Sequence, residues 1–354
     1  MPGRAVWHNP RGEGRPVRFV IHPRAAALAA PVALLLLRTA PKVAATQPVC
    51  AGNPAALPAV AHLRAALARA RFVAYEPTSL KVSDGHVTPA DPESIRADLS
   101  ALRPKFDALI TYDAIHGAES IAGIAAALKF RALIIGVWDP ANDAEVAAAV
   151  TAARRYPQLV LGLSLGNEML FSHRSDAASL AALIARVRAR LPGTALATTE
   201  PFHIYHQPEV APLLGQLDFV LVNAHPVFQP WFHQATDATA AQFVVNVLAE
   251  LAPIACGPIL VKETGMPTAP PGAGFSQARQ ASFYRELRAR LAPNPDRAFA
   301  YFAAFDAPWR AYDAIAVPGA APGIHPEEAH WGLFDAERSP KQAARELPAL
   351  PPGD

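Results

Sequence analysis

The chain has few cysteines, little net charge and no apolar run of membrane-spanning length in its leading segment. Its 354 residues include 2 cysteines, and 32 basic against 30 acidic side chains leave a formal net charge of +2. The uncharged run at residues 25–37 has 13 residues, whereas a spanning helix needs about 20. Cys50 and Cys256 are far apart in the sequence, which leaves open whether they pair or stay free thiols.

Several signature motifs are also missing. No G-x-G-x-x-G follows the first predicted strand and no G-x-x-x-x-G-K-[ST] occurs, so the common nucleotide-binding loops are excluded. Four histidines raise the alternative of a metallohydrolase, but they lack the H-E-x-x-H spacing that places two ligands and a base on one helix face. These histidines are His203, His206, His225 and His233.

The small net charge hides an uneven distribution. Residues 1–57 hold seven basic side chains and one acidic side chain, a surplus of +6, and the remaining 297 residues carry −4. An acidic body excludes general nucleic-acid binding, which requires a basic face to neutralise phosphates.

The basic segment resembles an export signal. Arginines precede the apolar run, and the small residues Val43, Ala44 and Ala45 follow it, which predicts cleavage after Ala45. A translation start assigned too far upstream is the alternative. We therefore expect a leader and linker at 1–57, a catalytic domain at 58–342 and a proline-rich tail at 343–354. The predicted location is periplasmic or secreted, with membrane anchoring through the leader as a further option.

From about residue 59, short apolar runs alternate with amphipathic segments rich in alanine, leucine and arginine. The runs have the continuous hydrophobicity of strands buried on both faces. The expected strands are 71–75, 107–112, 132–138, 159–165, 194–199, 218–224, 258–262 and 298–305. The expected helices are 92–103, 118–130, 142–155, 175–191, 209–215, 236–252 and 276–291. Eight such βα units predict a single-domain α/β fold, a (β/α)8 TIM barrel, with a doubly wound open sheet as the alternative.

A barrel brings the C-terminal ends of its strands to one mouth, where active sites lie. The fourth predicted strand ends in Asn167 and Glu168, and the seventh leads into Glu263. Two carboxylates across one mouth are what glycoside hydrolysis requires, one as acid and one as nucleophile or base. A loop salt bridge or helix cap is the structural alternative for either glutamate.

Aromatic and polar side chains follow the other strands, as a sugar site needs for ring faces and hydroxyls. We expect Trp138, Trp309 and Trp331 to stack on sugar rings. His225, Phe228 and Asp306 are further predicted cleft residues.

These residues carry a resemblance to glycoside hydrolase family 17 of clan A, which contains endo-1,3-β-glucanases and β-glucan transglycosylases. The matching pieces run in the family's order from Arg71 to Asp335, and ETG-x-P-[ST] and HWGLFD are the most specific. They read LGLSLGNE, VNAHPVF, ILVKETGMPT, YFAAFDAPWR and EEAHWGLFD. Met266, Ile110, Ala307 and Arg310 depart from the family pattern, which affects linkage and subsite detail.

The resemblance implies a retaining, double-displacement mechanism with Glu168 as acid/base and Glu263 as nucleophile. It implies that Asn167 binds the sugar 2-hydroxyl at the cleavage point. Further residues on positions that line the family's cleft are Tyr75, Tyr112, Asn223, Phe305, Trp309 and Glu328. A retaining mechanism predicts carboxyl groups about 5–5.5 Å apart, against about 6.5–9.5 Å for inversion.

Three hypotheses follow for the function. The first is a β-glucan hydrolase, expected to act on β-1,3 linkages, and the second is a β-glucan transglycosylase using the same two glutamates. The third is a non-catalytic carbohydrate-binding barrel. The expected partner is a β-glucan oligosaccharide or polysaccharide, with no cofactor and no metal, and the expected state is a monomer.

Overall fold

The computed structural model describes residues 48–83, 86–312 and 325–351. The predicted leader, including the apolar run and the cleavage site after Ala45, lies outside the described residues. Across the three described stretches, no helix is both long enough and apolar enough to cross a bilayer.

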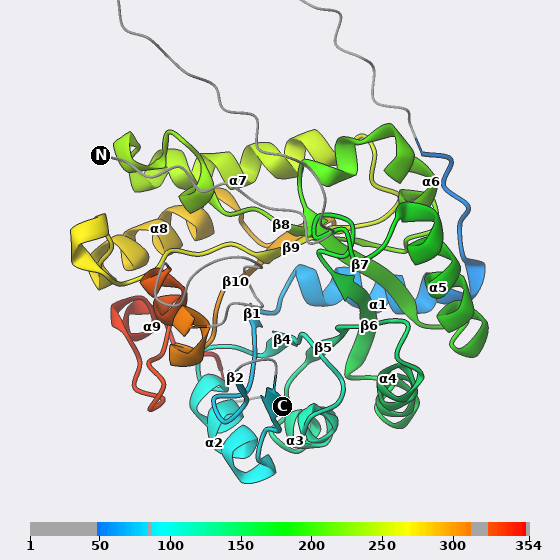
Figure 1. The fold of residues 1–354 in the computed structure, drawn as a ribbon, viewed down its shortest axis with the longest axis horizontal. Coiled ribbons are helices and arrows are strands. Elements are labelled where there is room, and N and C mark those ends of the chain that lie inside the picture. Colours follow the sequence, from blue (N-terminus) through cyan, green and yellow to red (C-terminus); the bar gives the residue numbers. More distant parts are fainter. Residues whose placement is uncertain (1–47, 84–85, 313–324, 352–354) are drawn as a thin grey trace, which may run out of the picture.

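Eight parallel strands form a closed barrel in the order β1-β10-β9-β8-β7-β6-β5-β4 (Figure 1). The strands are β1 (Phe72–Ala74), β4 (Ala108–Ile110), β5 (Ala132–Val137), β6 (Val160–Asn167), β7 (Ala195–Pro201), β8 (Val220–Asn223), β9 (Ile259–Glu263) and β10 (Arg297–Tyr301). Each overlaps one predicted strand. Because β1 pairs with both β4 and β10, the sheet has no free edge. The TIM barrel is confirmed and the open sheet is wrong.

Helices surround the strands (Figure 1). They are α1 (Leu57–Leu67), α2 (Pro92–Leu102), α3 (Ile121–Ala127), α4 (Asp143–Arg155), α5 (Ala177–Arg190), α6 (Ala211–Leu214), α7 (Asp237–Leu251), α8 (Gln277–Arg290) and α9 (Gln342–Glu346). Asp91, Asn142 and Asp176 are N-caps, whose side chains accept hydrogen bonds from backbone amides in the first turns of α2, α4 and α5. Each such cap contributes about 1 kcal/mol. A short hairpin, β2 (Lys81–Ser83) and β3 (His86–Thr88), lies outside the barrel sheet.

The barrel interior is packed and closed at its N-terminal end by α1, a helix that the sequence pattern did not predict. Alternate strand residues such as Phe72, Leu221 and Leu260 point inward and share one apolar cluster with Leu63 and Leu67 of α1. The residues between them belong to the larger cluster under the outer helices. The N-terminal end is therefore sealed, and chemistry is confined to the opposite mouth.

The packed body extends beyond residue 342, where the sequence predicted a tail to begin. Ala343 and Ala344 of α9 are buried, and so is Leu347. The amide of Leu350 donates to the carbonyl of Pro104 at 2.8 Å. Residues 343–350 are thus part of the domain.

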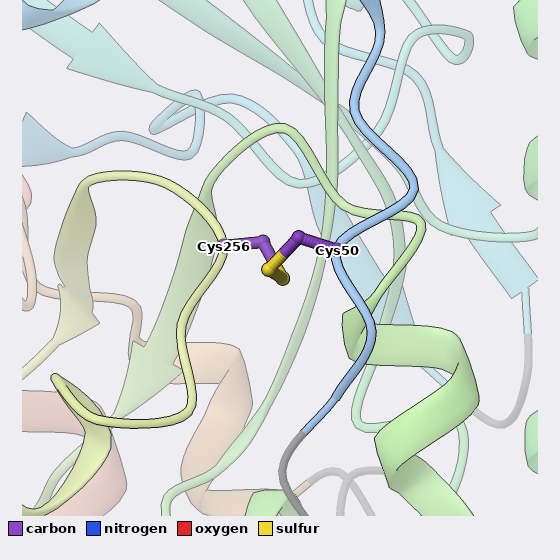
Figure 2. Close-up of a disulfide and its surroundings, with 2 residues drawn as sticks. All are labelled: Cys50 and Cys256. Carbon is purple, nitrogen blue, oxygen red and sulfur yellow. A yellow bond between two sulfur atoms is a disulfide. The ribbon is translucent and has the colours of Figure 1, made fainter.

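A disulfide joins Cys50 to Cys256, which resolves the pairing that the sequence left open (Figure 2). Cys256 lies just before β9, at the end of the barrel away from the mouth. The segment is also held by a hydrogen bond from the Ala51 amide to the Gly215 carbonyl at 2.8 Å. The disulfide therefore connects the start of the described chain to the barrel.

We expect Cys50→Ser to lower the free energy of unfolding by about 2–4 kcal/mol, because the cross-link restricts the unfolded chain. Denaturant unfolding under oxidising conditions measures this, and Cys256→Ser is the matched variant because it removes the same bond. Activity of the folded fraction should be unchanged, since the bond lies at the far end of the barrel. Equal stability of wild type and both variants would contradict the role.

Candidate active site

Glu168 lies on a sharp turn at the C-terminal end of β6. Gly166 and Glu168 have φ values of +84° and +53°, in the left-handed region that is costly for side chains other than glycine. A Cβ at Gly166 would approach Met169 Cγ to 2.5 Å, so this position requires glycine. The β6 register against β7 also shifts between Ser164 and Asn167. Strain of this kind at a strand end is typical of functional sites.

Glu200, at the end of β7, holds the turn in place. Its carboxylate accepts the amides of Leu170 and Phe171 at 2.9 and 3.1 Å, and burial raises its pKa to about 7. The Glu168 amide donates to the Thr199 carbonyl at 2.8 Å. Glu200 directly follows the predicted strand 194–199, but its contact to backbone amides about thirty residues away leaves no signal in the sequence.

Glu263 ends β9 and is almost fully buried, with 7% of its surface exposed. His225 Nε2 lies 3.3 Å from its Oε2, and Lys262 Nζ lies 3.8 Å from its Oε1. Asn223 is its register partner on β8. The Asn223 side chain donates from Nδ2 to Glu168 Oε1 at 2.8 Å. Asn223 therefore links the two glutamates, whose strands are separated by β7 and β8.

The two carboxyl groups differ in proton affinity. Burial, followed by the negative charge of Glu263, raises the pKa of Glu168. Burial acts in the same direction on Glu263, but the hydrogen bond from His225 and the charge of Lys262 outweigh it and hold its pKa below the usual value. One carboxyl group thus favours its acid form and the other its anion, as an acid and a nucleophile require.

Three buried polar atoms around the glutamates have no hydrogen-bond partner: Tyr112 Oη, Asn223 Oδ1 and His225 Nδ1. Buried polar groups are normally satisfied, so their convergence on one place indicates a polar ligand. Burial and the charge of Glu263 raise the pKa of Tyr112, so its hydroxyl remains a donor. A sugar, with hydroxyls that both donate and accept, matches this set.

Exposed aromatic faces lie at the mouth on both sides of β6. Trp138, after β5, is 46% exposed, and Phe228, after β8, is 62% exposed. The Arg174 guanidinium lies over the Trp138 ring at 4.7 Å from the centroid. Trp138 and Phe228 are therefore accessible for stacking on sugar rings.

Trp331 does not present an open face, contrary to the sequence expectation. It is 2% exposed, and its ring centroid lies 5.2 Å from that of His225 and 5.3 Å from that of Phe302. Its indole Nε1 donates to Glu328 Oε2 at 3.1 Å. Trp331 thus packs against the His225 ring, and the hydrogen bond to Glu328 fixes the orientation of its indole.

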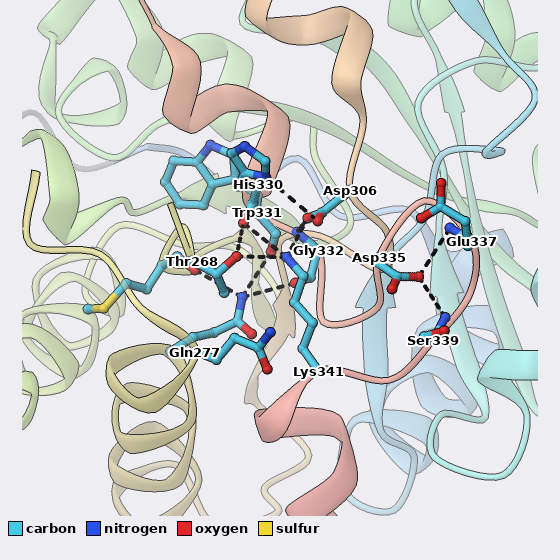
Figure 3. A network of polar contacts seen from close by, with 12 residues as sticks. Thr268, Gln277, Asp306, His330, Trp331, Gly332, Asp335, Glu337, Ser339 and Lys341 are labelled. Atoms are coloured by element: carbon cyan, nitrogen blue, oxygen red, sulfur yellow. Dashed lines mark hydrogen bonds and ion pairs between the residues drawn. The ribbon is translucent and has the colours of Figure 1, made fainter. Parts of the chain in front are cut away.

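Two further predicted cleft residues have structural partners. Tyr75 is fully buried and donates its hydroxyl hydrogen bond to Asp98 at 2.9 Å, so its hydroxyl group is bound within the fold. Asp306 accepts from Lys341 Nζ at 2.6 Å and from the Gly332 amide at 2.9 Å, within the network that fixes residues 330–341 (Figure 3).

The remaining predicted residues line a cavity next to Tyr112. Phe305 and Trp309 line it, with Tyr112, Glu76 and Arg310. Arg310 binds Glu76 at 2.9 Å and lies over the Phe302 ring at 4.9 Å from the centroid. The sequence marked Arg310 only as a departure from the family pattern, and its pairing with Glu76 is decided by the tertiary structure.

The four histidines of the metallohydrolase alternative do not form one cluster. His225 contacts Glu263, whereas the His203 ring packs against Phe171 and Phe202. Over the described ranges, no group of three or more histidine, cysteine or acidic side chains is arranged to hold a metal ion.

Comparisons with known structures support the fold. A glycoside hydrolase family 17 β-1,3-glucanosyltransferase from Rhizomucor miehei aligns with a TM-score of 0.60 at 23% identity, covering 77% of this chain and 95% of that one. An active-site mutant of the Rhizomucor miehei enzyme has been solved with laminaritriose. An endo-laminarinase from Formosa aligns with a TM-score of 0.61 at 19% identity, covering 78% of this chain and 86% of that one.

Sequence comparisons identify the family. A glucan 1,3-beta-glucosidase from Arthroderma benhamiae is 30% identical over 190 residues, which make up 51% of this chain and 59% of that protein. The alignment thus spans about three fifths of that relative's length. The BtgE/BtgC glycoside hydrolase domain model matches residues 73–332, from the first barrel strand to the loop that carries Trp331. With a barrel and two unequal glutamates over the same range, the chain belongs to the BtgE/BtgC glycoside hydrolase domain family.

Proposed function

We propose that this protein is a retaining enzyme acting on β-1,3-glucan, with Glu263 as nucleophile and Glu168 as general acid/base. The opposite pKa shifts of the two glutamates are the observation that carries the proposal. The family membership and the β-1,3-glucan activities named for the relatives support the substrate class.

The reaction has two displacements. Glu263 attacks the anomeric carbon while Glu168 gives its proton to the departing glycosidic oxygen, so that the C–O bond breaks and a glycosyl ester forms. Glu168, now an anion, takes a proton from an incoming hydroxyl group, which attacks the same carbon and releases Glu263. His225 and Lys262 stabilise the Glu263 carboxylate before the attack and after its release.

The incoming hydroxyl group decides between hydrolysis and transfer. Transglycosylation is favoured by one observation, the exposed faces of Trp138 and Phe228 at the mouth. Such faces bind an acceptor sugar and place its hydroxyl group near the ester, where it competes with water.

Incubation with laminari-oligosaccharides, analysed by mass, tests the proposal. Products longer than the donor indicate transfer, and only shorter products with glucose indicate hydrolysis. Oligosaccharides with β-1,4, β-1,6 and β-1,2 linkages serve as controls for the linkage. No turnover of any β-1,3-linked substrate by folded wild-type enzyme would refute the proposal.

We expect a bell-shaped pH profile of kcat/KM on a laminari-oligosaccharide, whose leaving oxygen needs the proton of Glu168. Activity appears as pH rises through the pKa of Glu263, which must be charged, and disappears as pH rises through the pKa of Glu168, which must be protonated. Since the first pKa is lowered and the second raised, the active range extends on both sides of the ordinary glutamate value of about 4.3. A profile without a basic limb would contradict the role of Glu168.

We also propose that the protein folds in an oxidising compartment, periplasmic or extracellular. The disulfide and the export-like leader support this location. Cell fractionation, with thiol labelling of Cys50 and Cys256 before and after reduction, tests it. A cytoplasmic protein with freely labelled thiols would refute it.

A further inference from the structure

Lys262 occupies an unusual place for a lysine. Leu260, two residues earlier on β9, points into the barrel interior, and Lys262 follows the same alternation. Lys262 is 1% exposed and is among the largest fully buried side chains of the described residues. Lysine is almost never fully buried unless it is paired, so an ammonium group under the catalytic mouth requires an explanation.

The contacts of Lys262 involve the catalytic groups themselves. Its Nζ donates to Asn167 Oδ1 at 2.6 Å and lies 3.8 Å from Glu263 Oε1. The Tyr112 ring covers it, with 4.1 Å between Nζ and the ring centroid. The Lys262 ammonium group thus contacts both Asn167, the residue before Glu168, and Glu263.

The contact with Lys262 determines which amide atom of Asn167 faces the substrate. Lysine is a donor only, so Asn167 must turn its amide oxygen toward Lys262 and present Nδ2 on the other side. An asparagine fixed in this way offers a hydrogen-bond donor, and not an acceptor, to a sugar hydroxyl group.

The second contact concerns charge. Three carboxylates act on Lys262: Glu76 from the loop after β1, Glu168 from the turn after β6, and Glu263 from the end of β9. Arg310 adds a positive charge from the segment after β10. Burial lowers the pKa of Lys262 to about 8, although the neighbouring glutamates oppose this. The ammonium form therefore persists throughout the acidic and neutral range in which Glu263 must be an anion.

We propose that Lys262 is a positioning residue that fixes the Asn167 amide as a donor to the substrate 2-hydroxyl group and keeps Glu263 ionised. This inference rests on the proposed retaining function. It adds a second role to β9, which then supplies both the nucleophile and the group that organises its surroundings.

The test compares wild type, Lys262→Met and Lys262→Arg on two substrates. One is a phenyl β-laminaribioside, whose weak leaving group needs the proton of Glu168, and the other lacks the 2-hydroxyl group on the sugar attached to the phenyl group. Methionine keeps the length and removes both charge and donor, whereas arginine keeps the charge and donates. Thermal unfolding of each variant shows whether it is folded, and Glu250→Gln on the outer surface of α7 is the control substitution.

We expect Lys262→Met to lower kcat/KM about 100-fold on the parent substrate, as the loss of one preorganised donor does. The loss on the 2-deoxy substrate should be several-fold smaller, because the 2-hydroxyl interaction is already absent. Both limbs of its pH profile should move up by about one unit, since a cation beside two carboxyl groups is lost. Lys262→Arg should keep the limbs of the wild-type profile, whatever its rate.

Equal losses on the two substrates together with unshifted limbs in Lys262→Met would overturn the inference while leaving the proposed function intact. If Lys262→Met does not fold, a Lys262→Arg profile whose limbs are shifted from those of wild type would overturn the inference. Failure of the proposed function is distinguished by wild type itself, which would then release no aryl group from the parent substrate.

Discussion

Replacing Glu263 by glycine is expected to lower glucan turnover at least about 10⁴-fold, which corresponds to about 5.4 kcal/mol of lost transition-state stabilisation. The reason is that the first displacement has no nucleophile, and the surrounding His225 and Lys262 cannot form the ester. Initial rates on an activated aryl β-laminaribioside measure the loss. The variant should remain folded, because the removed side chain has its contacts inside the site.

Added azide provides a second readout for this variant. With the Glu263 carboxylate gone, azide enters from the side on which it stood and attacks the anomeric carbon once. The product should therefore be the α-glycosyl azide, which NMR identifies. The control Glu250→Gln, on the exposed surface of α7, should keep wild-type rates. A β-glycosyl azide would exclude Glu263 as nucleophile.

Replacing Glu168 by alanine is the second large effect. We expect a loss of about 10²–10⁴-fold on laminari-oligosaccharides, because proton transfer to the leaving oxygen is worth that much. Formation of the ester from a dinitrophenyl glycoside should be nearly unaffected, since this leaving group needs no proton. Comparing the two substrates in single-turnover experiments measures the difference.

Azide acts differently on Glu168→Ala. Here it attacks the glycosyl ester of Glu263, so that two inversions give the β-glycosyl azide with retained configuration. Opposite azide anomers from the two variants would separate the two roles. An equal loss of ester formation on good and poor leaving groups would contradict the acid role of Glu168.

The position of the Glu168 side chain depends on a backbone turn that the sequence suggests but does not specify. The Gly-Asn-Glu order marks a strand end, and glycine at 166 permits a positive φ. The positive φ of Glu168 itself has no such marker, because glutamate rarely adopts this region. Contacts from Glu200 and Thr199 hold it there, and both come from the neighbouring strand.

The structure also separated residues that a strand-end pattern treats alike. Trp138 follows the strand β5, and Trp331 lies in the last loop after β10. Trp138 is 46% exposed, whereas Trp331 is 2% exposed. Tyr75 and Tyr112 each end a strand, but only Tyr75 finds a buried partner, Asp98. Exposure and partnering depend on neighbours from several strands, which local sequence does not encode.

The sequence by itself determined the eight-stranded barrel, the caps of its helices and the two glutamates, because each of these follows from local periodicity or from a strand's end. Only the tertiary structure decided that the pKa values of the two glutamates shift in opposite directions, that Cys50 pairs with Cys256, and that Lys262 contacts Asn167. Proton affinity and pairing depend on burial and on charges within a few ångströms, and folding brings those groups together from strands far apart in the chain.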